Sequence, residues 1–236
     1  MASTYLIVGG STGIGKVLSD ELLNAGHKVI VASRSAPERM DASRDGLSVH
    51  SVDATDETAD WSFIPEELDG IAYLGGSINL KPFHRLKQED FLNDFRVNLL
   101  GAVHSIQAAL PAMKKKGSGS VVLFSTVAVQ RGLTFHASVA SAKGAVEGLC
   151  RELSAELAPT VRVNAVALSL TETPMAEKLL SNDAKKEAAN ERHALKRYGK
   201  PEDVAHMAAY LLSSRSSWIT GQIIGVDGGM GTVQNL

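Results

Sequence analysis

The feature that most constrains the fold of this chain is a regular alternation of short apolar runs with longer amphipathic segments. Most of the apolar runs are apolar throughout, and they lie at residues 5–8, 28–32, 47–52, 70–74, 120–124, 161–166 and 222–226. Runs of this kind predict strands that are covered on both faces. Helical patterns lie between them, near residues 14–25, 88–115, 140–158, 174–190 and 202–213. Strand–helix alternation predicts a parallel sheet with right-handed crossovers.

We therefore expect one α/β domain over residues 1–236, a doubly wound parallel sheet of the Rossmann type with about seven strands flanked by helices. A chain of 236 residues is long enough for one large domain and short for two. Sheets of this class bind ligands beyond the carboxyl ends of their strands. The loops that follow the predicted strands are therefore the place to look for chemistry.

The charge and composition of the chain exclude several classes of function. A formal net charge of −2 gives no electrostatic footprint for nucleic acid or for an anionic membrane. No apolar run approaches the roughly 20 residues of a membrane span, and no signal peptide precedes the first strand, so we expect a cytoplasmic protein. The single cysteine, Cys150, can form no internal disulfide and is expected to pack inside a helix. No metal site is expected.

A glycine-rich loop follows the first predicted strand, in the segment Gly9-Gly-Ser-Thr-Gly-Ile-Gly15. Glycines in a strand–loop–helix context allow a tight turn and a close approach of a pyrophosphate to backbone N–H groups. The N-terminus of the following helix adds a favourable dipole. We expect these residues to bind a dinucleotide: Gly9, Ser11, Thr12, Gly13, Ile14 and Gly15.

The Gly-x-x-x-Gly-x-Gly pattern resembles the cofactor loop of the short-chain dehydrogenase/reductase family. Further matches run in order along the chain: Val52-Asp53-Ala54, Asn98 within 95–101, residues 162–166, Thr173-Pro-Met175, residues 199–204 and residues 220–229. The resemblance implies an oxidoreductase that binds a nicotinamide dinucleotide and a small-molecule substrate, with Asp53 and Ala54 at the adenine. It also implies a homodimer or homotetramer, assembled through the helices near 88–115 and 140–158.

The residues after the second strand favour NADP(H). Members of the family that use NAD carry an acidic residue there, whereas this chain has Ser33 and Arg34. A hydroxyl and a guanidinium suit a 2′-phosphate, because arginine donates a charge-assisted fork to phosphate oxygens. The alternative is that Arg34 is an ordinary solvated charge.

The catalytic residues of the family are a serine, a tyrosine and a lysine, supported by an asparagine. Lys143 matches the lysine, which grips the nicotinamide ribose, and Asn98 matches the asparagine. The serine position holds Thr126, which keeps a hydroxyl. The tyrosine position, four residues before the lysine, holds Val139, which can neither donate nor accept a proton.

Further departures from the family cluster at the nicotinamide end of the expected site. Tyr73-Leu-Gly-Gly76 stands where the family has Asn-Asn-Ala-Gly, and Leu168-Ser169 stands where it has Pro-Gly. We still expect contacts to the cofactor from Gly75, Gly76, Lys143, Leu168, Leu170 and Thr173.

Two routes restore a reaction without the tyrosine. His136 lies seven residues before Lys143, the spacing at which divergent enoyl-thioester reductases of this superfamily place their tyrosine, and imidazole titrates near neutral pH. Alternatively, the hydride adds to an activated alkene, and a hydroxyl such as that of Thr126 stabilises the enolate. Tyr73 is expected to pack beside the sheet instead.

The competing interpretation is a catalytically silent protein that binds NADPH as a regulator or as a subunit of an assembly. Val139 and the altered nicotinamide end favour it. The resemblance places a substrate lid around residues 174–193, and the polar side chains of this segment give a mild preference for a small or polar substrate.

Overall fold

The computed structural model describes residues 2–233. Its centre is one parallel sheet in the order β3-β2-β1-β4-β5-β6-β7. The strands are β1 (Thr4–Val8), β2 (Lys28–Ala32), β3 (Leu47–His50), β4 (Gly70–Tyr73), β5 (Gly119–Thr126), β6 (Val161–Leu168) and β7 (Ile223–Val226). This confirms the predicted fold class. The strand order switches direction between β1 and β4, which is where such sheets bind ligands.

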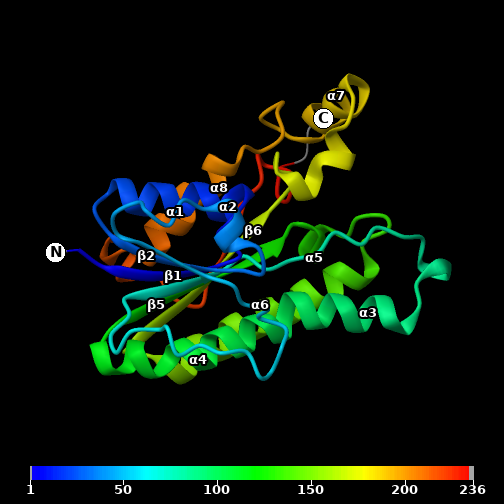
Figure 1. The fold of residues 1–236 in the computed structure, drawn as a ribbon. Coiled ribbons are helices and arrows are strands. Elements are labelled where there is room, and N and C mark those ends of the chain that lie inside the picture. Colours follow the sequence, from blue (N-terminus) through cyan, green and yellow to red (C-terminus); the bar gives the residue numbers. More distant parts are fainter. Residues whose placement is uncertain (1, 234–236) are drawn as a thin grey trace.

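Helices cover both faces of the sheet (Figure 1). One face carries α1 (Gly13–Asn24) and α8 (Pro201–Leu212), which pack against each other, and the other carries α4 (Gly101–Lys116) and α6 (Ala137–Leu157). Successive residues of each strand point to opposite faces. In β1, Tyr5 and Ile7 join the core under α1 and α8, while Leu6 and Val8 join the core under α4 and α6.

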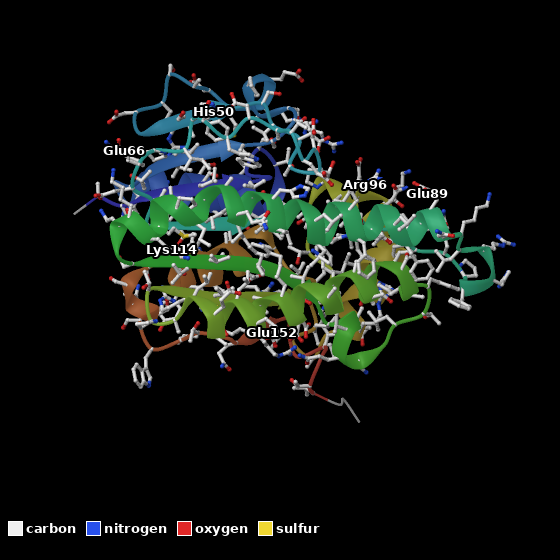
Figure 2. All side chains as sticks on the ribbon, turned by 90° about the horizontal axis from the view of Figure 1, so that it is seen from below. His50, Glu66, Glu89, Arg96, Lys114 and Glu152 are labelled. Carbon is white, nitrogen blue, oxygen red and sulfur yellow. The ribbon has the colours of Figure 1, made fainter. Side chains whose placement is uncertain are left out.

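The long helix predicted near 88–115 is correct, with a local irregularity. It consists of α3 (Gln88–Phe95), a π-helical turn η2 (Arg96–Leu100) and α4, and Figure 2 shows these as one rod that runs beside α6. The π turn is wider than an α turn, and such turns are frequent at functional sites. This one holds Asn98 with its side chain buried.

The helix predicted over 174–190 is wrong as a single element. Residues Pro174–Leu180 form the 3₁₀ turns of η3, and α7 (Asp183–Arg192) begins anew after them. The break arises because the side chain of Asn182 accepts a hydrogen bond from the backbone N–H of Lys185 at 2.9 Å and so caps a second helix.

Four short elements were not predicted: α2 (Ala36–Arg39), α5 (Ala128–Arg131), η1 (Phe83–Arg85) and η4 (Ser214–Ser216). Among residues 2–233, no helix combines the length and the apolarity that a bilayer crossing requires.

Candidate active site

A cleft of about 510 Å³ opens at the carboxyl ends of the strands. The loops after β1, β4, β5 and β6 form its floor and walls, and η3 and α7 also border it. The start of η3 approaches the glycine loop, since a Cβ on Gly13 would lie 3.7 Å from the ring of Pro174. Figure 1 shows η3 and α7 as an arm that stands away from the sheet at this end. The lining of the cleft is mainly apolar, and the charged residues in it are Lys143, Lys185 and Arg192.

The glycine loop forms a cradle of backbone at one end of the cleft. Gly9 and Gly13 have φ values of +83° and +52°, which favour glycine. A Cβ on Gly15 would lie 2.4 Å from the carbonyl oxygen of Gly9, so only glycine fits there. Thr12 makes no side-chain cap at the start of α1. The first N–H groups of that helix can therefore bind an anion.

The residues predicted to bind the adenosine lie outside the cleft, beyond the ends of β2 and β3. Ser33 donates a hydrogen bond to the Oγ of Ser11 at 2.9 Å, which joins the end of β2 to the glycine loop. Arg34 is exposed beside it. Asp53 accepts from the backbone N–H and the hydroxyl of Thr55, and these bonds hold the pKa of its carboxyl below the usual value.

Asn98 lies at the centre of a buried polar cluster. Its Nδ2 donates to the Oγ of Ser77 and to the carbonyl oxygen of Asp94, both at 2.8 Å. Ser77 in turn donates to the carboxylate of Asp94 at 2.6 Å. The Oδ1 of Asn98 has no hydrogen-bond partner within the described part of the chain, so it is an acceptor free for a ligand or a water.

Lys143 extends from α6 into the cleft, where it lies near Asn98. Its Nζ donates to the carbonyl oxygen of Phe124 at 2.9 Å. A Cβ placed on Gly76 would lie 3.5 Å from the Oδ1 of Asn98 and 3.8 Å from this Nζ, so the two polar atoms flank the same glycine. Burial lowers the pKa of Lys143 to about 8, and the charge of Asp94 opposes that shift.

Thr126, Val139 and His136 line the same cleft. Thr126 accepts a hydrogen bond from the backbone N–H of Ala128 at 3.2 Å, which leaves its hydroxyl proton free to donate. Val139 is 6% exposed and presents only methyl groups. The Nδ1 of His136 lies 2.7 Å from the carbonyl oxygen of Thr134. Because a carbonyl only accepts, this Nδ1 carries a proton, and in the neutral ring Nε2 is an acceptor.

Tyr73 packs in the core, as predicted, and does not line the cleft. It is 3% exposed and its hydroxyl donates to the carbonyl oxygen of Val97 at 2.6 Å. Burial raises the pKa of this phenol. Gly75 and Gly101 make room for its ring, since a Cβ on either would overlap the ring or its hydroxyl. Cys150 is buried, also as predicted.

The structure brings most of the predicted site residues together in this cleft. Those that line it are Gly9, Thr12, Gly13, Ile14, Gly15, Gly76, Thr126, His136, Lys143, Leu168, Leu170 and Thr173. The predicted residues outside the lining are Ser11, Ser33, Arg34, Asp53, Ala54, Gly75 and Asn98. Between residues 2 and 233, no three His, Cys, Asp or Glu side chains gather as a metal site would require.

Sequence reasoning missed Ser77, Asp94 and His193. Asp94 precedes Asn98 by four residues, so helical spacing alone could have placed the two on one face. His193 ends the lid segment and is 1% exposed, with its Nδ1 at 2.6 Å from the carbonyl oxygen of Ala189 and its Nε2 at 2.8 Å from the Oγ of Ser169. The contact to Ala189 is one helical turn away, but no local pattern signals the contact to Ser169, which lies 24 residues earlier in the loop after β6.

Comparison with known proteins relates nearly the whole chain to one group of oxidoreductases. A family model described as enoyl-(acyl carrier protein) reductase matches residues 8–231. L-xylulose reductase of Bos taurus is 33% identical over 232 residues, which cover 95% of this chain and 94% of that protein. A short-chain type dehydrogenase/reductase from Mycobacterium ulcerans has a TM-score of 0.86 at 28% identity and covers 97% of this chain and 90% of its own. ElxO with NADP bound has a TM-score of 0.88 at 26% identity, with coverages of 98% and 99%.

Proposed function

Because the chain belongs to the short-chain dehydrogenase/reductase family, we propose that it is an NADP(H)-dependent reductase with an altered proton donor. The proposed substrates are a carbonyl compound or an activated alkene. One observation carries the proposal: Lys143, Thr126 and His136 line the same cleft as the glycine loop. That cleft therefore offers a dinucleotide cradle, a cation, a hydroxyl and a titratable imidazole within one small volume.

The glycine cradle fits the pyrophosphate of a dinucleotide. Gly15 allows the tight turn of the loop, and the uncapped start of α1 leaves backbone N–H groups without a side-chain partner, as an anion site requires. Ser33 and Arg34 would hold a 2′-phosphate, since the guanidinium attracts the charge that a carboxylate would repel. The related ElxO structure has NADP bound, which supports this choice. When bound, the nicotinamide group supplies a hydride.

Val139 occupies the position of the family's tyrosine, and its methyl groups cannot supply a proton. His136 lies three residues earlier, at the start of α6. Its Nδ1 proton is engaged by the carbonyl oxygen of Thr134, so a neutral ring presents Nε2 only as an acceptor. The imidazolium form donates from Nε2. His136 therefore acts as a general acid in its protonated state and receives a proton in the reverse direction.

Thr126 orients the substrate oxygen. Its Oγ1 already accepts from the backbone N–H of Ala128, and its proton remains available to donate to an oxygen in the cleft. A hydroxyl in this position stabilises the negative charge on a carbonyl or enolate oxygen. The match to a family model described as enoyl reductase supports an activated alkene beside a simple ketone as the substrate class.

The lining of the cleft supports a small-molecule substrate with a mainly apolar body and an anionic end. Ile78, Leu80, Leu133, Met175 and Leu179 line the cleft. The charged residues of the lining are all cations, and no carboxylate lines it in the described part of the chain. A substrate with an apolar body and an anionic end differs from the small or polar substrate that the sequence of residues 174–193 favours. We assign that segment, η3 and α7, the role of the substrate lid.

A second candidate function follows from Val139 alone. A chain that binds NADPH through its cradle, without a competent acid, would be a silent regulator or a subunit of an assembly. Assembly as a homodimer or homotetramer through α4 and α6 accompanies either function. The single domain over residues 1–236 and the cytoplasmic location stay predictions.

Two measurements test the proposed function. Titration calorimetry should show tighter binding of NADPH than of NADH. Oxidation of NADPH should then be stoichiometric with product when the enzyme meets enones, enoyl thioesters or reactive diketones. Binding without oxidation in all three classes would favour the silent function, and absence of NADPH binding would reject both.

A further inference from the structure

A carboxylate is buried behind the cleft, on the side of Lys143. Asp94 belongs to α3, which packs against α6, and it is 2% exposed. Its carboxylate accepts from the hydroxyl of Ser77 at 2.6 Å, and the amide of Asn79 lies at 3.5 Å, the limit of a hydrogen bond. The position of Ser77 in the lining of the cleft places this carboxylate one hydroxyl away from the reaction space.

These neutral donors do not compensate a buried negative charge. Removing a carboxylate from water costs several kcal/mol unless a positive charge accompanies it. Within residues 2–233, no cation lies within 4.0 Å of Asp94. The cation whose titration responds to Asp94 is Lys143. Ser77 and Asn98 lie between Asp94 and Lys143. Asn98 donates to Ser77 through its amide. The unpartnered Oδ1 of Asn98 and the Nζ of Lys143 both flank Gly76.

We propose that Asp94 is a positioning residue that, through Ser77 and Asn98, keeps Lys143 charged and directed into the cleft. The inference rests on the proposed function, together with the contact to the nicotinamide ribose that the family resemblance implies for Lys143. Asp94 supplies an interaction with the amine that Val139 cannot. A phenol at position 139 would share a proton with Lys143, whereas valine leaves the amine with only the carbonyl oxygen of Phe124 as a hydrogen-bond partner. A buried counter-charge retains the ammonium in an apolar wall.

The other charged groups around Lys143 are engaged elsewhere or are cationic. Asp90, one turn before Asp94, pairs with Lys81 at the surface, at 2.5 Å. Glu147, one turn after Lys143 on α6, accepts from Ser125 and lies 3.4 Å from Arg151. The remaining groups in the cleft lining are bases, whose protonated forms repel the ammonium: His136, His193, Lys185 and Arg192. Asp94 is therefore the carboxylate left to stabilise it.

The test compares NADPH binding from pH 6 to pH 9.5 in the wild type, Asp94→Asn and Asp90→Asn. Asparagine keeps the shape and the acceptor for Ser77 but removes the charge. We expect wild-type affinity to fall as the pH rises through about 8, where Lys143 loses its proton. In Asp94→Asn this fall should move down by about one pH unit, with affinity near pH 8 reduced about fivefold and affinity at pH 6 unchanged. Asp90→Asn should follow the wild type.

Asp94→Ser, a second neutral variant, decides the matter if Asp94→Asn does not fold. An unshifted profile in the folded neutral variant overturns the inference, and so does an equal loss of affinity at every pH, which would indicate a structural role only. The variant Lys143→Met distinguishes a wrong role for Asp94 from a failure of the proposed function. If that variant retains the wild-type pH dependence, Lys143 does not hold the cofactor; if it loses the dependence while Asp94→Asn shifts nothing, only the role of Asp94 is wrong.

Discussion

The Nζ of Lys143 donates to the carbonyl oxygen of Phe124 at 2.9 Å, so the amine of α6 is tied to the end of β5. This bond fixes the lysine beside the cleft and restricts its motion toward bulk water. Its environment lowers the pKa to about 8, since burial disfavours the charged form. The amine is an ammonium below that pH and becomes neutral as the pH rises through it.

Lys143→Met should weaken NADPH binding and flatten its pH dependence. A charge-assisted hydrogen bond contributes about 1.5–3 kcal/mol, which corresponds to roughly 10–100-fold in affinity. Below pH 8 the wild type should hold this advantage, and above it the two proteins should converge. Calorimetric titration at several pH values measures the difference. A constant ratio of affinities from pH 6 to pH 9.5 would contradict the assignment.

Val139→Tyr should create or greatly raise carbonyl reductase activity if the proton donor is the missing element. The position is buried in the cleft lining, so a phenol there would share the cleft with Thr126 and Lys143. General acid catalysis contributes about 10²–10⁴-fold, so kcat should gain at least 10² if the wild type has no acid, and much less if His136 already supplies the proton. Val139→Phe adds the same ring without the hydroxyl and is the control. Equal activity of the two variants would mean that the substrate geometry is also altered.

Arg34→Asp should reverse the cofactor preference. The carboxylate would repel a 2′-phosphate and accept from a ribose hydroxyl, so the ratio of NADPH to NADH affinity should fall about 10–100-fold. Arg39→Asp makes the same charge change on the exposed end of α2 and is the matched control. An unchanged ratio in Arg34→Asp would show that the arginine is a solvated charge.

Gly15→Ala should abolish dinucleotide binding and destabilise the fold. The new methyl group would lie 2.4 Å from the carbonyl oxygen of Gly9. Because this is a backbone atom, rotation of a side chain cannot relieve the clash. Overpacking of this kind costs about 1–3 kcal/mol of unfolding free energy. Gly148→Ala, on α6, meets no atom within 4 Å and should be neutral or stabilising by up to about 1 kcal/mol. Urea denaturation measures both, and equal stability of the two variants would refute the steric argument.

The parts of the molecule that follow from local patterns were predictable. The apolar runs predicted all seven strands, and the glycine loop predicted the start of α1, because these signals depend only on neighbouring residues. The break at Asn182 was missed because a single cap outweighed the helical pattern of residues 174–190. Asp94 was missed for another reason: its burial depends on the packing of α3 against α6, which spacing along the chain does not reveal.

The same limit applies to His136. The spacing to Lys143 identified it as a candidate, but only the structure places its ring in the cleft lining, with its Nδ1 facing the carbonyl of Thr134. That orientation leaves Nε2 to act on a substrate. Reduction of a carbonyl without the tyrosine depends on this nitrogen more than on any other atom of the chain.

The most direct test is therefore NADPH oxidation by the wild type and by His136→Gln, with product measured alongside. His84→Gln, an exposed histidine on η1, is the control. We predict stoichiometric turnover in the wild type and in His84→Gln, a loss of about 10²-fold or more in kcat for His136→Gln, and unchanged NADPH affinity. If His136→Gln turns over at the wild-type rate, or if the wild type binds NADPH and oxidises none, the account is wrong.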